Sequence, residues 1–534
     1  MQFFAKKIHV DQHGKATNFC LYSLGQPHMR ALHMSWLSFM VAFFSWYSIP
    51  PLISYIAADL KVSRDKVYDS NVVAVSATIV ARFVVGPFCE RFGPRRVMAS
   101  LLLIGSIPCA MTGLLQGAGG LIGLRLVIGI LGATFIPCQF WTTQMFSPSI
   151  VGTANAITAG WGNMGAGITY LIMPAIYGGI RRHLPLTKAW RVVYVIPAAL
   201  CILVAVADLL FATDTPHGDW FKPKEADVEA DRDDPSKEKK EDIPDEVNVA
   251  STSKDIGTEK NDGVTAKVVA ADEESIADVK RDESALSAFL GFFKVLAKPA
   301  VLIMVCAYAC SFGIELAIDN VIGQVFEKRF HLNPSTAAYI GSIFGLLNIC
   351  SRLSGGLFSD FMAHRFHMPG RILALLIGML LEGVFLISFS FSLVSLKTSI
   401  ILMVFFSFFV QAVCGLTFGI VPFIDPLNNG KVMGIIGAGG NLGGLVFNLM
   451  FRGSCGGWVQ LVTRATQNYM ASLQQTVLVV GLVVGPNPCT TIVRIFKHAV
   501  GLIVRPNPST TIMHLLLHGV FSGLILTTVS HLIN

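Results

Sequence analysis

Apolar runs of about 20 residues recur along this 534-residue chain, and each is long enough to cross a lipid bilayer as a helix. Only 14% of the residues are charged, against about 25% in a typical soluble domain. A soluble fold would need helices that are apolar on every side and stacked away from water, so this class is disfavoured. Because lipid does not tolerate unpaired backbone polar groups, the pattern predicts an all-α membrane protein.

The predicted spans form a group of six and a group of five, with a long hydrophilic segment between them. The spans are Met34–Ile56, Val72–Phe88, Val97–Leu115, Leu121–Met145, Ala154–Tyr177 and Trp190–Leu210, then Ala300–Ile322, Thr336–Phe358, Ile372–Phe391, Ile400–Ile424 and Val432–Phe451. The corresponding division is an N-terminal tail (1–30), an N-terminal six-helix half (31–212), a central loop (213–289), a C-terminal half (290–452) and an atypical tail (453–534). Residues 513–532 of that tail are the candidate for a twelfth span.

The central loop is predicted to be disordered, because it is rich in charge and has few aromatic residues. It contains 22 of the 34 acidic residues, so the membrane part of the chain is clearly basic. A basic membrane part suits contact with anionic lipid and with an anionic solute. No basic helix or aromatic-interleaved patch supports binding of nucleic acid, and no apolar N-terminal region predicts a cleavable signal peptide.

Two motifs occur once in each half, at nearly the same offset. The segment 82–90 resembles 352–360, and Gly162-Asn-Met-Gly resembles Gly440-Asn-Leu-Gly. Two matches in the same order indicate duplicated halves, as in transporters built from two bundles. The lysine and arginine residues of the N-terminal tail and of the loops after the second and eighth spans all lie on one side, which we expect to be cytoplasmic together with the central loop. These residues are Lys6, Lys7, Lys15, Arg30, Arg91, Arg95, Arg96, Arg365 and Arg371.

Arg82 and Arg352 are the strongest candidates for a binding site, because each lies in the middle of an apolar span. A charge inside a membrane is unfavourable and is usually functional. Pseudo-symmetry would bring the two guanidinium groups to one central site, where two planar forks suit a small planar oxyanion. The alternative is that each arginine pairs with a carboxylate, but no acidic residue lies in the body of either helix.

The repeated Gly-Asn segments are the second pair of candidates. Glycine in a helix interior is less favourable than alanine by about 1 kcal/mol, so its repeated use indicates close helix packing or approach of a ligand. Asn163 and Asn441 each offer an amide to an anion, although helix packing alone also explains the motif. The glycines of the two segments are Gly160, Gly162, Gly165, Gly439, Gly440 and Gly443.

No catalytic constellation is visible in the sequence: there is no phosphate-binding loop, nucleophile motif or His/Cys cluster. We therefore expect no enzyme activity, no metal site and no cofactor. Cys306 and Cys310 lie four residues apart in an apolar helix, a spacing typical of packing.

These motifs resemble the nitrate/nitrite porter family of the major facilitator superfamily, over residues 30–452. The resemblance implies a fold of two six-helix bundles in the plasma membrane, which moves nitrate and nitrite by alternating access. Arg82 and Arg352 match the family's paired substrate-binding arginines, and Asn163 and Asn441 match its signature asparagines. The aromatic residues that carry over to the site are Phe135, Tyr308 and Phe312. The chain departs from the family after Arg452, where a well-formed twelfth helix is expected.

The loop after the second helix resembles the family's short cytoplasmic loop, whose charges latch the two halves together. The predicted latch residues are Glu90, Arg95, Asp360 and Arg365; anchoring at the membrane surface is the alternative. The expected mechanism is that substrate offsets the repulsion of two facing cations and lets the halves close.

Eukaryotic family members are typically proton symporters, so protonatable groups are expected inside the spans. Glu315 and Asp319 are the candidates by position, with Asp208 and Glu382 as others. The alternative for each is an ion pair, for example with Arg125. A nitrate/nitrite exchanger and a non-transporting nitrate sensor remain open, whereas a channel is disfavoured because no helix has a continuous polar stripe. The sequence does not identify an accessory subunit.

Overall fold

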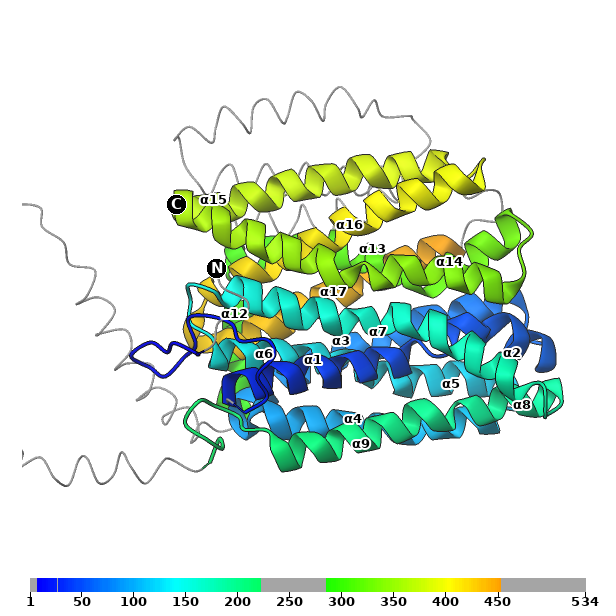
Figure 1. Ribbon diagram of the computed structural model, residues 1–534, viewed down its shortest axis with the longest axis horizontal. Coiled ribbons are helices and arrows are strands. Elements are labelled where there is room, and N and C mark those ends of the chain that lie inside the picture. The colour runs from blue at the N-terminus through cyan, green and yellow to red at the C-terminus, as the bar shows by residue number, and fades with distance from the viewer. Residues whose placement is uncertain (1–6, 26, 222–284, 453–534) are drawn as a thin grey trace, which may run out of the picture.

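The computed structural model describes residues 7–25, 27–221 and 285–452 (Figure 1). Over these residues the regular secondary structure is helical, with only isolated β-bridges besides. Helices satisfy their own backbone hydrogen bonds, which is what a lipid environment requires. Most of the central loop and the tail after Arg452, with its candidate span 513–532, lie outside the described residues.

The N-terminal half supplies six spans, several of which are built from consecutive helical segments. They are α1 (Pro27–Trp46) with η1 (Pro50–Leu52) and α2 (Ile53–Asp59), α3 (Arg64–Phe92), α4 (Pro94–Met111) with η2 (Thr112–Leu114), α5 (Ala118–Ile128) with η3 (Gly129–Thr134) and α6 (Phe135–Met145), α7 (Val151–Ile180), and α8 (Leu186–Val193) with α9 (Val195–Phe211). Six spans before the central loop agree with the prediction.

The C-terminal half begins with a short helix that the sequence did not predict, α12, which starts inside the segment expected to be disordered. Its elements are α12 (Ala285–Leu296), α13 (Pro299–Arg329), α14 (Pro334–Leu346), α15 (Asn348–Phe391), α16 (Leu396–Ile420), η4 (Val421–Phe423), η5 (Pro426–Asn428) and α17 (Asn429–Arg452). The ring of Phe292 in α12 packs edge-on against that of Phe83 in α3, with 5.2 Å between centroids.

The described residues contain a helix at the place of each of the eleven predicted spans. Nine helical stretches are long and apolar enough to span a bilayer. One of them, Pro334–Phe391, holds two spans divided at His367, whose φ of 54° breaks the helix. The helix at the fifth predicted span, α7, is 30 residues long but rich in glycine and polar residues, and it is not among these nine.

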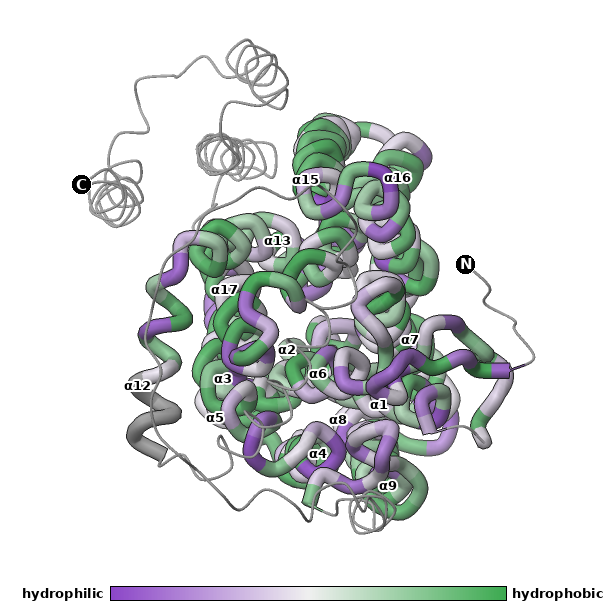
Figure 2. The backbone as a smooth tube through the Cα atoms, turned by 90° about the vertical axis from the view of Figure 1, so that its left-hand side faces the viewer, coloured by the Kyte–Doolittle hydropathy of each residue, from purple (hydrophilic) through white to green (hydrophobic). Residues whose placement is uncertain are grey.

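The two halves meet where α3 packs against α17 and where α7 packs against α14, α15 and α16. In Figure 1 the helices of the second half lie beside those of the first, and Figure 2 shows the same bundles end-on. Glycine permits the closest approaches. A methyl group on Gly86 of α3 would lie 2.6 Å from the carbonyl oxygen of Gly430 in α17, and one on Gly167 of α7 would overlap α14 at Gly345. The interface between the halves is therefore tightly packed at both contacts.

Segments next to the spans are also ordered at one end of the bundle. In the N-terminal tail, the backbone N–H of Ala16 donates to the carbonyl oxygen of Met145 at 2.9 Å. Beyond α9, the chain continues in contact to Phe221, and the indole of Trp141 donates to the carbonyl oxygen of Thr213 at 2.8 Å. The ordered part thus extends past the predicted start of the central loop.

Candidate substrate site

Arg82 lies within α3, is fully buried, and reaches both halves of the molecule. Its Nε donates to the carbonyl oxygen of Gly132 at 2.9 Å, and its Nη1 donates to that of Gly437 in α17 at 2.7 Å. Gly132 belongs to η3, a 3-10 turn inside the fourth span, and such interruptions often mark functional regions. Nη2 is buried without a hydrogen-bond partner among the described residues. Arg82 therefore keeps one donor nitrogen available.

An aromatic wall surrounds this guanidinium and contains all three predicted rings. The Cζ of Arg82 lies 5.0 Å from the ring centroid of Phe135 and 5.1 Å from that of Phe312. Tyr308 stacks on Phe312 with 4.9 Å between centroids. Phe418 closes the wall edge-on, 4.7 Å from Phe135 and 5.1 Å from Tyr308. The rings come from α6, α13 and α16, so they exclude water from a place where both halves meet.

Arg352, in α15, reaches the same wall. Its Cζ lies 5.5 Å from the centroid of Phe312, the ring that Arg82 also contacts. The fold therefore brings the two symmetry-related arginines to one ring, as the duplicated motif predicted. Both side chains are fully buried.

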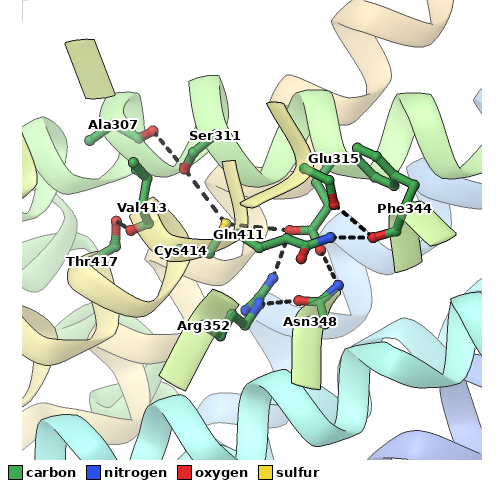
Figure 3. Close-up of polar contacts among 11 residues, drawn as sticks. Ala307, Ser311, Glu315, Phe344, Asn348, Arg352, Gln411, Val413, Cys414 and Thr417 are labelled. Carbon is green, nitrogen blue, oxygen red and sulfur yellow. Dashed lines mark hydrogen bonds and ion pairs between the residues drawn. The ribbon is translucent and has the colours of Figure 1, made fainter. Parts of the chain in front are cut away.

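The surroundings of Arg352 correct the expectation that no carboxylate balances either arginine. Its Nη2 lies 2.8 Å from Oε2 of Glu315 in α13, and the two side chains are 0% and 1% exposed (Figure 3). Its Nε donates to Oδ1 of Asn348 at 2.9 Å. The balancing carboxylate, Glu315, comes from the seventh span. The prediction had taken account only of acidic residues on the helices that carry the arginines.

The two signature asparagines have different neighbours. With the Asn163 amide oriented so that its oxygen faces the guanidinium, Oδ1 accepts from Nη1 of Arg352 at 3.2 Å and from Nε at 3.1 Å. Asn163 thus orients an arginine of the opposite half. Asn441 donates through Nδ2 to the carbonyl oxygen of Gly437 at 3.0 Å, while its buried Oδ1 has no hydrogen-bond partner in the described chain.

The signature glycines bring α7 and α17 against neighbouring helices. A methyl group on Gly160 would lie 2.5 Å from the carbonyl oxygen of Asn348 and 3.0 Å from Cβ of Arg352. On Gly440 it would lie 2.6 Å from a ring carbon of Tyr308 and 2.8 Å from one of Phe312. Side chains at the other four positions would also overlap their neighbours, which are Phe39 for Gly162, Met40 for Gly165, Val305 for Gly439 and Ala309 for Gly443. The glycines thus fix the positions of Arg352 and the aromatic wall.

Two of the predicted latch residues contact the opposite half, at equivalent places. At the end of α3, Oε1 of Glu90 accepts from the backbone N–H of Lys431 at 3.2 Å, and Oε2 lies 3.7 Å from Nζ of that lysine. In α15, Oδ2 of Asp360 accepts from the backbone N–H of Thr153 at 2.8 Å, and Oδ1 lies 2.7 Å from Nη2 of Arg371. Each carboxylate therefore meets the first turn of a helix in the other half, where backbone N–H groups attract anions.

The other two latch residues make no such contact within the described chain. Arg95 pairs inside its own half, with Asp214 at 3.4 Å and Asp219 at 3.0 Å. Burial raises the pKa of Asp214 above its ordinary value, and the hydrogen bond from the backbone of Arg95 offsets part of that rise. Arg365 is exposed. The arginine that pairs with Asp360 is Arg371.

The proton-coupling candidates are all buried, and Glu315 forms an ion pair with Arg352. Asp319 has none with a described cation, and Asp208 accepts from the hydroxyl of Ser38 at 2.7 Å. Arg125, the expected partner for these acids, is held by neutral groups instead. Its Nη1 donates to Ser70 at 3.1 Å and to Asn71, and its Nη2 donates to Oδ1 of Asn320 at 3.0 Å in the opposite half.

Metal chemistry has no ligand set in the part of the chain that the structure describes. No group of three or more His, Cys, Asp or Glu side chains is arranged to hold an ion there. The polar groups that converge at the centre are guanidinium, amide, carboxylate and phenol groups, which suit an anion and protons.

Comparison with known proteins places this site in a family. The family model of the Major Facilitator Superfamily matches residues 35–448. High affinity nitrate transporter 2.5 of Arabidopsis thaliana is 38% identical over 445 residues, which cover 83% of this chain and 77% of the relative. This chain belongs to the nitrate/nitrite porter family of the major facilitator superfamily.

Other relatives of this porter extend from algae to cyanobacteria. Nitrate transporter 2.1 of Chlamydomonas reinhardtii is 34% identical, with 85% of this chain and 74% of the relative covered. Nitrate/nitrite transporter NrtP of Nostoc punctiforme is 26% identical, with 79% of this chain and 86% of the relative covered. Among solved structures, the human organic anion transporter MFSD10 (TETRAN) matches with a TM-score of 0.53 at 13% identity, covering 84% of this chain and 99% of that one. This last likeness shows the shared fold.

Sequence reasoning missed three side chains at the centre of the porter: Asn348, Cys414 and Phe418. Asn348 lies one helical turn before Arg352, a spacing that places both on one face of α15. That spacing was the available signal. Phe418 and Cys414 lie in α16, a helix so rich in phenylalanine and small residues that nothing in its sequence distinguishes them.

Proposed function

We propose that this protein carries nitrate and nitrite across the plasma membrane by alternating access, with the anion bound between Arg82 and Arg352. The relatives' names supply the substrate. The observation that carries the proposal is the buried Nη2 of Arg82, which lies without a hydrogen-bond partner in the described chain, beside an aromatic wall at the junction of the halves.

A small planar oxyanion fits these groups chemically. Guanidinium donates hydrogen bonds in a plane, and nitrate offers acceptor oxygens in a plane. The phenol of Tyr308 is also buried without a hydrogen-bond partner among the described residues, so it offers a further donor near Arg82. Exclusion of water by the rings strengthens each charge-assisted bond, because the local dielectric constant is low.

Polar contacts between the halves at opposite ends of the bundle support alternating access. Glu90 and Asp360 tie the halves at the end that carries the α3–α4 turn. At the other end, the hydroxyl of Ser54 donates to Glu327 at 2.8 Å, and the hydroxyls of Tyr55 and Ser335 lie 3.2 Å apart. Opening one end while the other stays tied would expose the central site to one side at a time.

The end with Glu90 and Asp360 is the proposed cytoplasmic end. Arg91, Arg96 and Arg365 lie at that end, in the loops on which the expected orientation rests, although the short loops at the other end also carry lysine and arginine. The N-terminal tail and the central loop would lie on the same side.

Transport is proposed to be proton-coupled, since buried carboxylates lie beside the site. The decisive test is uptake of labelled nitrate in a host that lacks nitrate transport, with and without a protonophore. Symport predicts that the protonophore abolishes uptake. Exchange predicts uptake that persists without a pH gradient but needs internal nitrite, and a sensor predicts binding without counterflow in proteoliposomes.

Arg82→Lys tests the site directly, because Arg82 has no carboxylate partner among the described residues that the substitution would leave unpaired. A single ammonium cannot reproduce the separate bonds to Gly132 and Gly437 and also donate to an anion. Losing one charge-assisted bond of about 1.5–3 kcal/mol predicts uptake lowered on the order of tenfold or more at low nitrate. Arg181→Lys, at an exposed cation after α7, is the matched control. Wild-type uptake by Arg82→Lys, at equal amounts in the membrane, would refute the site.

A further inference from the structure

We infer that the carboxylate of Glu315 occupies the substrate position at Arg352, so that the anion gains Arg352 only when Glu315 takes up a proton. This inference rests on the proposed function and specifies its coupling: one proton is bound with each anion, at one named residue. The proton adds to the carboxylate oxygen, the ion pair to Arg352 breaks, and the freed N–H groups donate to the anion.

The geometry of the pair is that of an arginine with a bound oxyanion. Oε2 of Glu315 accepts from Nη2 of Arg352 at 2.8 Å, deep inside the protein (Figure 3). Oε1 accepts from Nδ2 of Asn348 at 3.0 Å, and Asn348 in turn accepts from Nε of Arg352 at 2.9 Å. A carboxylate and nitrate both present planar acceptor oxygens, so they compete for the same guanidinium edge.

The two arginines differ in a way that supports competition. Each nitrogen of Arg352 has a protein acceptor, from Glu315, Asn348 or the Asn163 amide oxygen. Arg82 donates to two backbone carbonyl oxygens and has no carboxylate or amide partner in the described chain, where its Nη2 makes no bond of good geometry. An anion can therefore reach Arg82 directly but must displace Glu315 to bind between both arginines. The ring centroid of Phe312 lies 5.1 Å from Cζ of Arg82 and 5.5 Å from Cζ of Arg352. Phe312 also precedes Glu315 by one turn of α13.

The net charge of the site gives the physical reason why one proton binds with each anion. The ionised set of Arg82, Arg352 and Glu315 carries one net positive charge in a dry site. Adding an anion alone would place it beside the Glu315 carboxylate, and like charges repel strongly at low dielectric constant. Adding the anion and a proton together leaves the net charge of the site unchanged. Binding of each ligand then favours binding of the other, since linkage is reciprocal.

Other groups near Glu315 do not replace it in this role. Cys414 of α16 donates through Sγ to its Oε2 at 3.4 Å, Tyr47 of α1 and Tyr308 of α13 lie within electrostatic range, and Asp319 follows one turn later. Arg352 is the one cation within ion-pair distance of Glu315 in the described chain. Asp319 forms no ion pair with a described cation, so its protonation would not free Arg352.

The test counts protons during nitrate binding. Full-length wild-type protein, Glu315→Gln and Asp319→Asn are titrated with nitrate by calorimetry over a series of pH values, in buffers of different ionisation enthalpy. For wild type we expect about one proton taken up per nitrate, and an apparent affinity that falls about tenfold per pH unit where Glu315 is ionised. Glu315→Gln should bind nitrate with no proton uptake and no pH dependence. Asp319→Asn should still take up about one proton per nitrate.

Transport in proteoliposomes gives a second readout. Glu315→Gln should retain nitrate counterflow but lose accumulation driven by a pH gradient, while Glu315→Asp, which can still titrate, should keep it. Three results would overturn the inference: wild type that binds nitrate without taking up a proton, Glu315→Gln that still takes one up, or Glu315→Gln that loses nitrate binding at every pH. If Glu315→Gln does not fold, the wild-type proton count decides alone. Failure of wild type to bind nitrate or catalyse counterflow would instead refute the proposed function.

Discussion

Arg82 and Arg352 occupy equivalent positions in the two halves, yet their partners differ. Arg82 donates to two backbone carbonyl oxygens, whereas Arg352 is bound to a carboxylate and two amides. This difference alters the gating argument based on two repelling cations, because Glu315 already neutralises one of them. The pseudo-symmetric site is therefore chemically asymmetric.

The ion pair predicts different stabilities for variants of the two arginines. Arg352→Ala strands Glu315 as a buried unpaired carboxylate, which in proteins destabilises by about 3–5 kcal/mol. We expect a clearly lower melting temperature in detergent than for Arg82→Ala, together with loss of uptake. The double variant Arg352→Ala with Glu315→Gln should regain much of the melting temperature but no uptake. Near-normal uptake by Arg352→Ala would contradict a substrate role for that arginine.

At the scale of elements, the aromatic wall depends on how closely α17 packs against α13. The two helices touch at glycine, and Gly440 lies directly against the rings of Tyr308 and Phe312. Close approach also lets the carbonyl oxygen of Gly437 reach Arg82 across the junction of the halves. The glycine signature therefore acts through helix packing as well as through its asparagine.

Gly440→Ala should inactivate the transporter without unfolding it. The added methyl group would lie 2.6 Å from a ring carbon of Tyr308, so the ring and with it the wall must shift. Overpacking of this kind destabilises by about 1–3 kcal/mol. We expect uptake to fall on the order of tenfold or more while insertion, followed by immunoblot, persists. Gly123→Ala is the matched control, since its methyl group meets nothing within 4 Å; equal uptake by both variants would contradict the packing role.

At the scale of the whole molecule, polar contacts tie the halves at both ends of the bundle. Glu90 and Asp360 act at one end, and the pair Ser54 and Glu327 acts at the other. Arg125 adds a contact to Asn320 across the halves. Because alternating access requires one end to open while the other stays closed, the balance between these sets determines which side opens.

Asp360→Asn should shift this balance toward opening at the α3–α4 end. The substitution removes the ion pair to Arg371 and weakens the bond from the backbone N–H of Thr153. Distances between spin labels placed on the two halves at that end should lengthen, and hydrogen exchange at the start of α7 should rise. Arg365→Gln, at the exposed arginine of the neighbouring turn, should change neither. Identical distance distributions for wild type and Asp360→Asn would argue against the latch.

Arg125→Gln should favour opening at the end away from Glu90, the opposite of the effect expected for Asp360→Asn. It removes donors to Ser70 and Asn71 and the contact to Asn320 in the other half. We expect the population open at the end away from Glu90 to increase, visible as longer label distances there. Longer label distances at the Glu90 end would show that Arg125 does not hold the halves together at the opposite end.

The sequence alone determined the membrane class, the eleven spans and the duplicated halves. Those features depend on local hydropathy and on repeated motifs, and both can be recognised from the order of residues alone. It also singled out Arg82 and Arg352, because charge in an apolar span is unfavourable unless it is used, whereas the aromatic residues were expected only from the family resemblance. Their convergence on one ring follows from the duplication.

Only the tertiary structure decided which carboxylate meets which arginine. Glu315 and Arg352 are 37 residues apart on different helices, and Arg125 was an equally reasonable partner by composition. Helix rotation sets that pairing, and it has no signature in local sequence, although the glycine motifs indicate which helices pack closely. The same holds for Arg371, which lies beyond the helix break at His367 and pairs with Asp360, whereas Arg365 of the same segment is exposed.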